Sequence, residues 1–153
     1  MKPNYLTENP AQTKKLGECL AKEIIKMPSK DRAFILGLGG DLGSGKTTFL
    51  QGFARGLGIK EKVLSPTFVV MKKFQISSSM FQYFYHLDCY RIQKSKEILT
   101  LGFKEIIDGP KNIIAIEWAE KIKTLLPKQT IWLKFYFLDN KKRRILISQI
   151  KKQ

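Results

Sequence analysis

Cysteine is scarce in this chain of 153 residues, which contains only Cys19 and Cys89. Two cysteines so far apart provide neither a disulfide framework nor the paired spacing of a zinc site. No apolar run approaches the ~18–20 residues needed to cross a bilayer, and the N-terminal segment lacks the apolar stretch of a signal peptide. These absences argue against the secreted, membrane and zinc-binding classes. They predict a soluble protein of the reducing cytoplasm.

Acidic residues are also few, since 13 Asp and Glu face 28 Lys and Arg, for a formal net charge of +15. Basic surfaces gain affinity for nucleic acids by releasing counterions from phosphates. The lysines, however, are spread along the whole chain. The densest basic run, residues 141–144, follows Asp139 and Asn140 and is predicted to form a solvated turn between two strands. Direct nucleic-acid binding therefore remains an alternative to binding an acidic protein partner.

The segment that decides the chemistry is residues 40–47, G-D-L-G-S-G-K-T, which fits the Walker A phosphate-binding loop G-x-x-x-x-G-K-[ST]. The apolar run at 33–38 predicts a buried strand before it. Phe49, Phe53 and Leu57 recur at steps of four after it and predict a helix. Strand, glycine loop and helix are the context that this motif requires. The sequence therefore predicts a nucleotide site.

The chemistry of the loop follows from its residue types. Backbone N–H groups at a helix N-terminus attract phosphates, and glycine permits the backbone angles of a tight loop. Lys46 is expected to reach the β- and γ-phosphates, and the Thr47 hydroxyl to take one position on Mg²⁺. The predicted ATP-binding residues are Gly43, Ser44, Gly45, Lys46, Thr47 and Thr48.

Two further segments suit a phosphate-handling site. Ser65-Pro66-Thr67 is a proline-stiffened loop with hydroxyl groups that could sense a γ-phosphate, as switch loops do, although most such triplets are simple turns. The apolar run at 113–116 ends in Glu117, in the form of a Walker B strand with Glu in place of Asp. Glu117 is the predicted second metal ligand; a helix-capping role is the alternative.

The run His86-Leu-Asp-Cys-Tyr-Arg91 ends an aromatic segment that is predicted to be a strand. Asp88 could orient water or a metal ligand, and Arg91 could pair with Asp88 or with a phosphate. His86 is the only histidine of the chain. It is interpreted as a structural or interface residue rather than as a general base.

The remaining patterns indicate one α/β domain over residues 1–153. Asn9-Pro10 predicts the start of a helix that continues to Pro28. Short helical segments are expected at 94–101 and 119–126, and strands at 68–76, 81–87, 113–117, 130–138 and 143–150, of which the last two form a hairpin. Because short turns join some of these strands, the sheet must be mixed. The predicted architecture is a three-layer sandwich of the P-loop NTPase type, with a partly parallel sheet and a C-terminal β-hairpin.

The order of G-D-L-G-S-G-K-T-T-F, S-P-T-F, H-L-D-C-Y-R and I-E-W-A-E resembles the TsaE (formerly YjeE) family along nearly the whole chain. That family consists of bacterial P-loop ATPases required for the threonylcarbamoyladenosine (t6A) modification of tRNA. Phe68 in place of a frequent Tyr, Cys89 inside the third motif and the unusually positive charge are mild departures.

The resemblance implies ATP binding with slow hydrolysis and a catalytic set of Lys46, Asp88 and Thr67, with Thr67 in the switch-like loop. It places Thr47 and Glu117 on Mg²⁺. It also implies a partner, the TsaB–TsaD heterodimer, whose TsaD subunit modifies adenosine 37 of tRNA. ATP turnover would reset that complex between cycles, so that tRNA would be met only indirectly.

Two other classes remain as alternatives. A P-loop small-molecule or nucleotide kinase usually supplies lid arginines, whereas only Arg55 and Arg91 lie between Arg32 and Arg143. An RNA-associated protein with ATP as a structural ligand would use the basic charge. A GTPase is disfavoured because the chain has no Asn/Thr-Lys-x-Asp segment.

Overall fold

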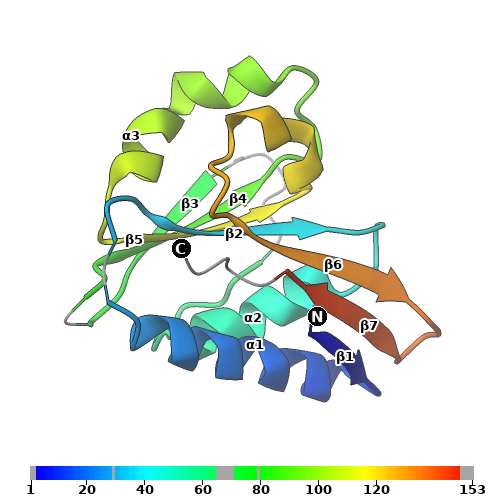
Figure 1. Ribbon diagram of the computed structural model, residues 1–153. Coiled ribbons are helices and arrows are strands. Elements are labelled where there is room, and N and C mark those ends of the chain that lie inside the picture. The colour runs from blue at the N-terminus through cyan, green and yellow to red at the C-terminus, as the bar shows by residue number, and fades with distance from the viewer. Residues whose placement is uncertain (1–2, 29, 65–70, 79, 149–153) are drawn as a thin grey trace.

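The computed structural model describes residues 3–28, 30–64, 71–78 and 80–148. Within these ranges a seven-stranded sheet has the order β1-β7-β6-β2-β5-β4-β3, with helices on both faces (Figure 1). The strands are β1 Asn4–Thr7, β2 Phe34–Gly39, β3 Met71–Gln75, β4 Tyr83–Asp88, β5 Asn112–Glu117, β6 Ile131–Phe137 and β7 Arg143–Ile147. The helices are α1 Pro10–Ile25, α2 Lys46–Gly56 and α3 Phe103–Asp108, with the 3₁₀ segments η1 Ser95–Leu101 and η2 Ala119–Leu125.

The sheet is mixed, as predicted. The central strands β6, β2, β5 and β4 run parallel to one another. Antiparallel pairing joins β7 to β6, β1 to β7 and β3 to β4. Because β2, β5 and β4 are parallel, their carboxyl ends meet at one edge. Ligands of open α/β sheets bind in the crevice outside such ends.

Helices α1 and α2 form the layer on one face of the sheet (Figure 1). The Asn9 side chain accepts a hydrogen bond from the Gln12 N–H, which caps α1 as predicted. The two helices can cross closely because each has a glycine at the contact. A Cβ on Gly17 would lie 2.2 Å from the Phe49 carbonyl oxygen, and a Cβ on Gly52 would lie 1.9 Å from the Lys14 carbonyl oxygen. The core on this face includes Leu36, Leu38, Phe49, Phe53, Phe84, Phe135 and Ile145.

The opposite face is covered by η1, α3 and η2, which gives the predicted three layers (Figure 1). The core on this face includes Ile35, Leu87, Ile98, Phe103, Ile114, Ile116 and Ile122. Odd and even positions of β5 thus enter different cores: Ile113 and Ala115 face α2, and Ile114 and Ile116 face η2. Glu117 continues the side that faces α2.

Two elements were not predicted from the sequence. Strand β1 pairs antiparallel with β7, yet only Thr7 of its four residues is buried, so it has no readable apolar alternation. Helix α3 follows η1 directly, because Gly102 takes a left-handed conformation (φ 78°) and changes the chain direction. The predicted strand 68–76 begins at Met71 in the described ranges, since 68–70 lie outside them. None of the helices in these ranges has the length and hydrophobicity of a bilayer-spanning segment.

Candidate nucleotide-binding site

The loop between β2 and α2 has the backbone of a phosphate cradle. Gly43 and Gly45 adopt φ angles of 77° and 102°, and Gly45 is the N-cap of α2. These angles lie in the left-handed region, which side chains with a Cβ rarely adopt. The loop can therefore turn its N–H groups toward one point at the N-terminus of a helix, where the helix dipole favours an anion.

Lys46 lies folded back over this loop, with its side chain largely buried. Its Nζ donates hydrogen bonds to the carbonyl oxygens of Gly40 and Asp41, the latter at 2.9 Å. Burial lowers the pKa of the Lys46 ammonium, and nearby carboxylates, chiefly Glu117, act in the opposite direction. The ammonium thus rests at the centre of the loop, where phosphate oxygens could replace the carbonyls as its partners.

Trp118 closes the other side of the lysine. The Lys46 Nζ lies 4.3 Å from the centroid of the Trp118 ring, a cation–π distance. Among the described residues Trp118 is the only non-glycine with positive φ, at 57°. Such backbone strain tends to occur at functional sites. Nothing in the sequence indicated this position, because its role depends on the turn after β5.

The structure brings Thr47 and Glu117 together although 70 residues separate them. The Thr47 hydroxyl donates to Glu117 Oε1 at 2.9 Å, and β5 pairs with β2 so that Glu117 stands opposite Leu38. Mg²⁺ is usually held in nucleotide sites by a hydroxyl or one or two carboxylates together with substrate phosphates. No group of three His, Cys, Asp or Glu gathers into a metal cage in the described ranges. One hydroxyl and one carboxylate beside a phosphate loop therefore fit Mg²⁺.

His86 is the third member of this buried chain. Its Nε2 lies 2.7 Å from Glu117 Oε2, and both side chains are excluded from solvent. The structural interpretation of His86 thus holds in part: it contacts a predicted metal ligand. The sequence did not indicate this pairing, because the two residues belong to different strands.

Asp88 ends β4 at the same edge of the sheet. It stands opposite Glu117 in the register of β4 and β5, and its Oδ1 accepts the Tyr90 N–H at 2.9 Å. This carboxylate therefore stands beside Glu117, and its charge also acts on the Lys46 ammonium. The predicted switch residue Thr67, with Ser65 and Pro66, lies outside the described residues.

Comparisons with known proteins address the family. The family model described as "Threonylcarbamoyl adenosine biosynthesis protein TsaE" matches residues 7–145. The chain belongs to the TsaE family. It is 34% identical to the "tRNA threonylcarbamoyladenosine biosynthesis protein TsaE" of Bacillus subtilis over 95% of this chain and 85% of that protein. The protein of the same name from Haemophilus influenzae is 31% identical over 88% of this chain and 82% of its own length.

Among solved structures, the crystal structure of Bacillus subtilis YdiB superposes with a TM-score of 0.76 at 29% sequence identity. It covers 99% of this chain and 87% of that one. The family resemblance and the predicted P-loop type of α/β fold are both confirmed.

Arg143 is a site residue that the sequence did not indicate. Residues 141 and 142 do form the predicted turn, with both N–H groups 2.8 Å from Asp139 Oδ1. Arg143, however, turns toward the TsaE-family phosphate loop and donates to the Gly43 carbonyl oxygen at 3.0 Å. Its guanidinium also lies 4.6 Å from the Phe137 ring centroid. The alternation of β7, in which Ile145 and Ile147 are buried, was the one available signal.

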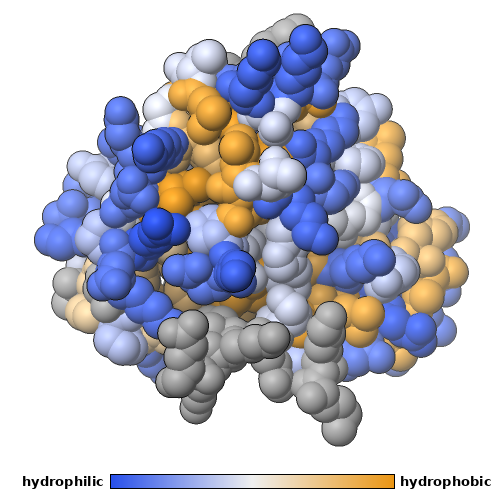
Figure 2. Space-filling model, turned by 45° about the horizontal axis from the view of Figure 1, so that its top comes forward, coloured by the Kyte–Doolittle hydropathy of each residue, from blue (hydrophilic) through white to orange (hydrophobic). Residues whose placement is uncertain are grey.

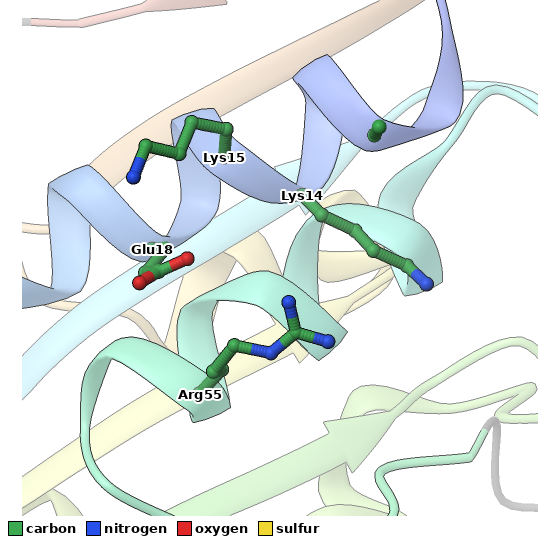
Figure 3. Close-up of a pocket in the computed structure, with 5 residues that line it drawn as sticks. Lys14, Lys15, Glu18 and Arg55 are labelled. Carbon is green, nitrogen blue, oxygen red and sulfur yellow. The ribbon is translucent and has the colours of Figure 1, made fainter.

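A hollow of about 350 Å³ lies on the outer surface of α1 and α2, away from the loop that precedes α2. It is lined by Ala11, Lys14, Lys15, Glu18 and Arg55 (Figure 3). Lys15 and Arg55 are exposed, and Glu18 pairs with Lys22 at 3.1 Å. None of the lining residues is buried. On the face drawn in Figure 2, hydrophilic residues surround an area of hydrophobic ones. Among the described residues, the basic side chains at this hollow therefore stand on an open surface.

Proposed function

We propose that this TsaE-family protein binds ATP with Mg²⁺, hydrolyses it slowly and serves t6A biosynthesis in the cytoplasm by acting on a TsaB–TsaD heterodimer. One observation carries the nucleotide part: Lys46, Thr47 and Glu117 converge at the carboxyl ends of β2 and β5. The pathway part is supported by the family membership and by the printed names of the curated relatives.

Different residues of the site would bind different parts of ATP and Mg²⁺. The loop amides and the N-terminus of α2 hold the phosphate chain, and Lys46 exchanges its loop carbonyls for phosphate oxygens. Thr47 and Glu117 would hold Mg²⁺, which when bound shields phosphate charge and polarises the terminal phosphoryl group. Arg143 adds a positive charge at the outer side of the loop.

We expect Asp88 to assist hydrolysis. It lies at the edge that carries Glu117, and its carboxylate is fixed by the Tyr90 N–H. A carboxylate at this position can orient a water molecule for attack on the terminal phosphate. Thr67 would report the γ-phosphate from the switch-like loop.

An accessory role is supported by the family membership and by the names of the relatives. The described helices and strands supply one nucleotide edge, and the hollow on α1 and α2 is lined by unburied side chains. The curated relatives are named for tRNA threonylcarbamoyladenosine biosynthesis and not for the phosphorylation of a small molecule or nucleotide. We therefore expect the bound nucleotide to control a surface for a partner rather than to phosphorylate a second substrate.

Measuring ATP turnover by the purified protein, alone and with the TsaB–TsaD pair, tests the proposal. We expect slow turnover alone and faster turnover with the pair. ATP should also tighten binding to the pair by a coupling of ~1–3 kcal/mol, which Thr67→Ala should reduce. Stimulation by unmodified tRNA alone would support the RNA-associated alternative, and failure to bind ATP would overturn the proposal.

A further inference from the structure

A buried chain of hydrogen bonds joins three elements of the fold. Thr47 at the start of α2 donates to Glu117 Oε1, and Glu117 Oε2 lies 2.7 Å from His86 Nε2. The relative exposure of His86 is 0%, and that of Glu117 is 3%. A carboxylate so removed from water is costly unless both oxygens are hydrogen-bonded. Thr47 satisfies one oxygen and His86 the other.

The sheet places His86 diagonally beneath Glu117. In the parallel register of β4 and β5, His86 stands opposite Ala115, two residues before Glu117 on the same side of the sheet. Diagonal neighbours of this kind are within reach of long side chains. The imidazole therefore supports the carboxylate from the interior side, and Thr47 contacts it from the side of the phosphate loop.

The geometry also assigns the direction of the hydrogen bond. A carboxylate can only accept, so the His86 Nε2 carries the hydrogen and donates it to Glu117 Oε2. The other ring nitrogen, Nδ1, is buried and has no hydrogen-bond partner among the described residues. His86 is thus enclosed by protein and lies behind Glu117 as seen from the phosphate loop. It is placed to hold a ligand and not to touch a nucleotide.

We propose that His86 is a positioning residue that holds the Glu117 carboxylate in the orientation required to bind Mg²⁺ together with Thr47. The inference rests on the proposed nucleotide function and extends it to a residue outside the phosphate and metal contacts. Groups that orient a metal ligand from behind typically contribute 10–100-fold to metal affinity or activity.

The test compares two substitutions that differ in where they place a donor. In His86→Gln the side-chain amide nitrogen is as many bonds from Cβ as the imidazole Nε2, so it can still reach Glu117. In His86→Asn the amide is shorter and occupies the region of Nδ1. His86→Leu removes the donor, and Phe84→Leu is the control because Phe84 is a buried β4 neighbour that contacts Phe53 and Phe74.

Calorimetric titration of Mg²⁺ into each protein saturated with a non-hydrolysable ATP analogue measures metal affinity. Binding of the analogue without Mg²⁺ measures the phosphate loop separately. We expect His86→Leu and His86→Asn to weaken Mg²⁺ binding by about 10–100-fold. Metal-free nucleotide affinity should stay close to that of the wild type, because the phosphate loop is unchanged. His86→Gln should recover most of the loss, and Phe84→Leu should leave Mg²⁺ affinity unchanged.

Equal Mg²⁺ affinity in the wild type, His86→Gln and His86→Asn would overturn the positioning role. So would an equal loss in the Phe84→Leu control, because that would trace the effect to stability. If His86→Leu does not fold, the Gln and Asn pair decides alone. A wild-type protein that binds neither the analogue nor Mg²⁺ would instead refute the proposed nucleotide function, so the two failures are distinguishable.

Discussion

The two halves of the sheet differ in what they bury. At the carboxyl ends of β2, β5 and β4, three ionisable side chains are removed from solvent and tied to one another or to the phosphate loop: Lys46, His86 and Glu117. In the half made by β1, β7 and the end of β6, large apolar side chains face solvent instead: Tyr5, Leu6, Tyr136 and Phe137.

The contrast follows from the topology. Parallel strands bring several carboxyl ends to one edge, where side chains from distant segments meet and exclude water. Strands β7 and β1 extend the sheet beyond β6 by antiparallel pairing. From β7, Arg143 donates a hydrogen bond to the Gly43 carbonyl oxygen of the loop. We call the half with β2, β5 and β4 the inner half, and the half with β1, β7 and the end of β6 the outer half. We expect substitutions in the inner half to affect ATP binding and hydrolysis strongly, and substitutions in the outer half to affect them weakly.

The largest effect is expected from Lys46→Ala. Losing two charge-assisted hydrogen bonds to phosphate, at about 1.5–3 kcal/mol each, should weaken ATP binding by about 100-fold or more. The fold should remain intact, because the ammonium contributes charge at the loop rather than core packing. Isothermal titration with ATP and thermal unfolding measure the two quantities. Lys14→Ala, on the outer surface of α1, is the control. Undiminished ATP affinity in a folded Lys46→Ala protein would contradict the prediction that Lys46 binds the phosphates.

Glu117→Gln keeps the volume of the side chain and removes the charge. We expect hydrolysis to fall by on the order of 100–1,000-fold, while nucleotide affinity falls only a few-fold because the loop amides still hold the phosphates. Steady-state turnover and nucleotide titration on the same sample separate the two effects. An equal loss in both quantities would mean that Glu117 supports the loop and not the metal.

Asp88→Asn tests the role of the carboxylate at the end of β4. If Asp88 orients the attacking water, turnover should fall by on the order of 100-fold with ATP affinity close to wild type. Single-turnover hydrolysis at saturating ATP isolates this step. Wild-type turnover would restrict Asp88 to its hydrogen bond with the Tyr90 N–H.

Arg143→Ala probes the hydrogen bond from β7 to the loop. The Arg143 hydrogen bond to the Gly43 carbonyl has a charged but partly exposed donor, so the low end of the range for charged groups, about 1.5 kcal/mol, predicts a loss of ATP affinity of about 10-fold. Arg144→Ala is the matched control, since adjacent residues of β7 point to opposite faces and Arg144 stands opposite Leu6. Equal effects of the two substitutions would indicate a general charge effect, which raised salt would also remove.

The smallest effect on chemistry is expected from Asn9→Ala. Removing the cap of α1 should lower the free energy of unfolding by about 1 kcal/mol and leave ATP turnover of the folded protein unchanged. Denaturant unfolding measures the first and a turnover assay the second. Asn9→Asp, which keeps an acceptor for the Gln12 N–H, should retain most of the stability.

The sequence by itself determined the local parts of this protein. Glycine spacing and the flanking periodicity predicted the loop, β2 and α2, and Asn9-Pro10 predicted the start of α1, because caps, glycines and apolar periods act within a few residues. β1 and α3 escaped prediction because one has a single buried residue and the other depends on the turn at Gly102.

Only the tertiary structure decided how the site is assembled. Thr47 and Glu117 are 70 residues apart, Glu117 and His86 are 31 apart, and Arg143 reaches Gly43 across 100 residues. These contacts depend on strand order and register, and a shift of one residue would turn each side chain to the other face of the sheet. The residue types indicated which chemistry was available. The packing of the sheet decided which of these residues touch, because burial of both faces selects one register out of many.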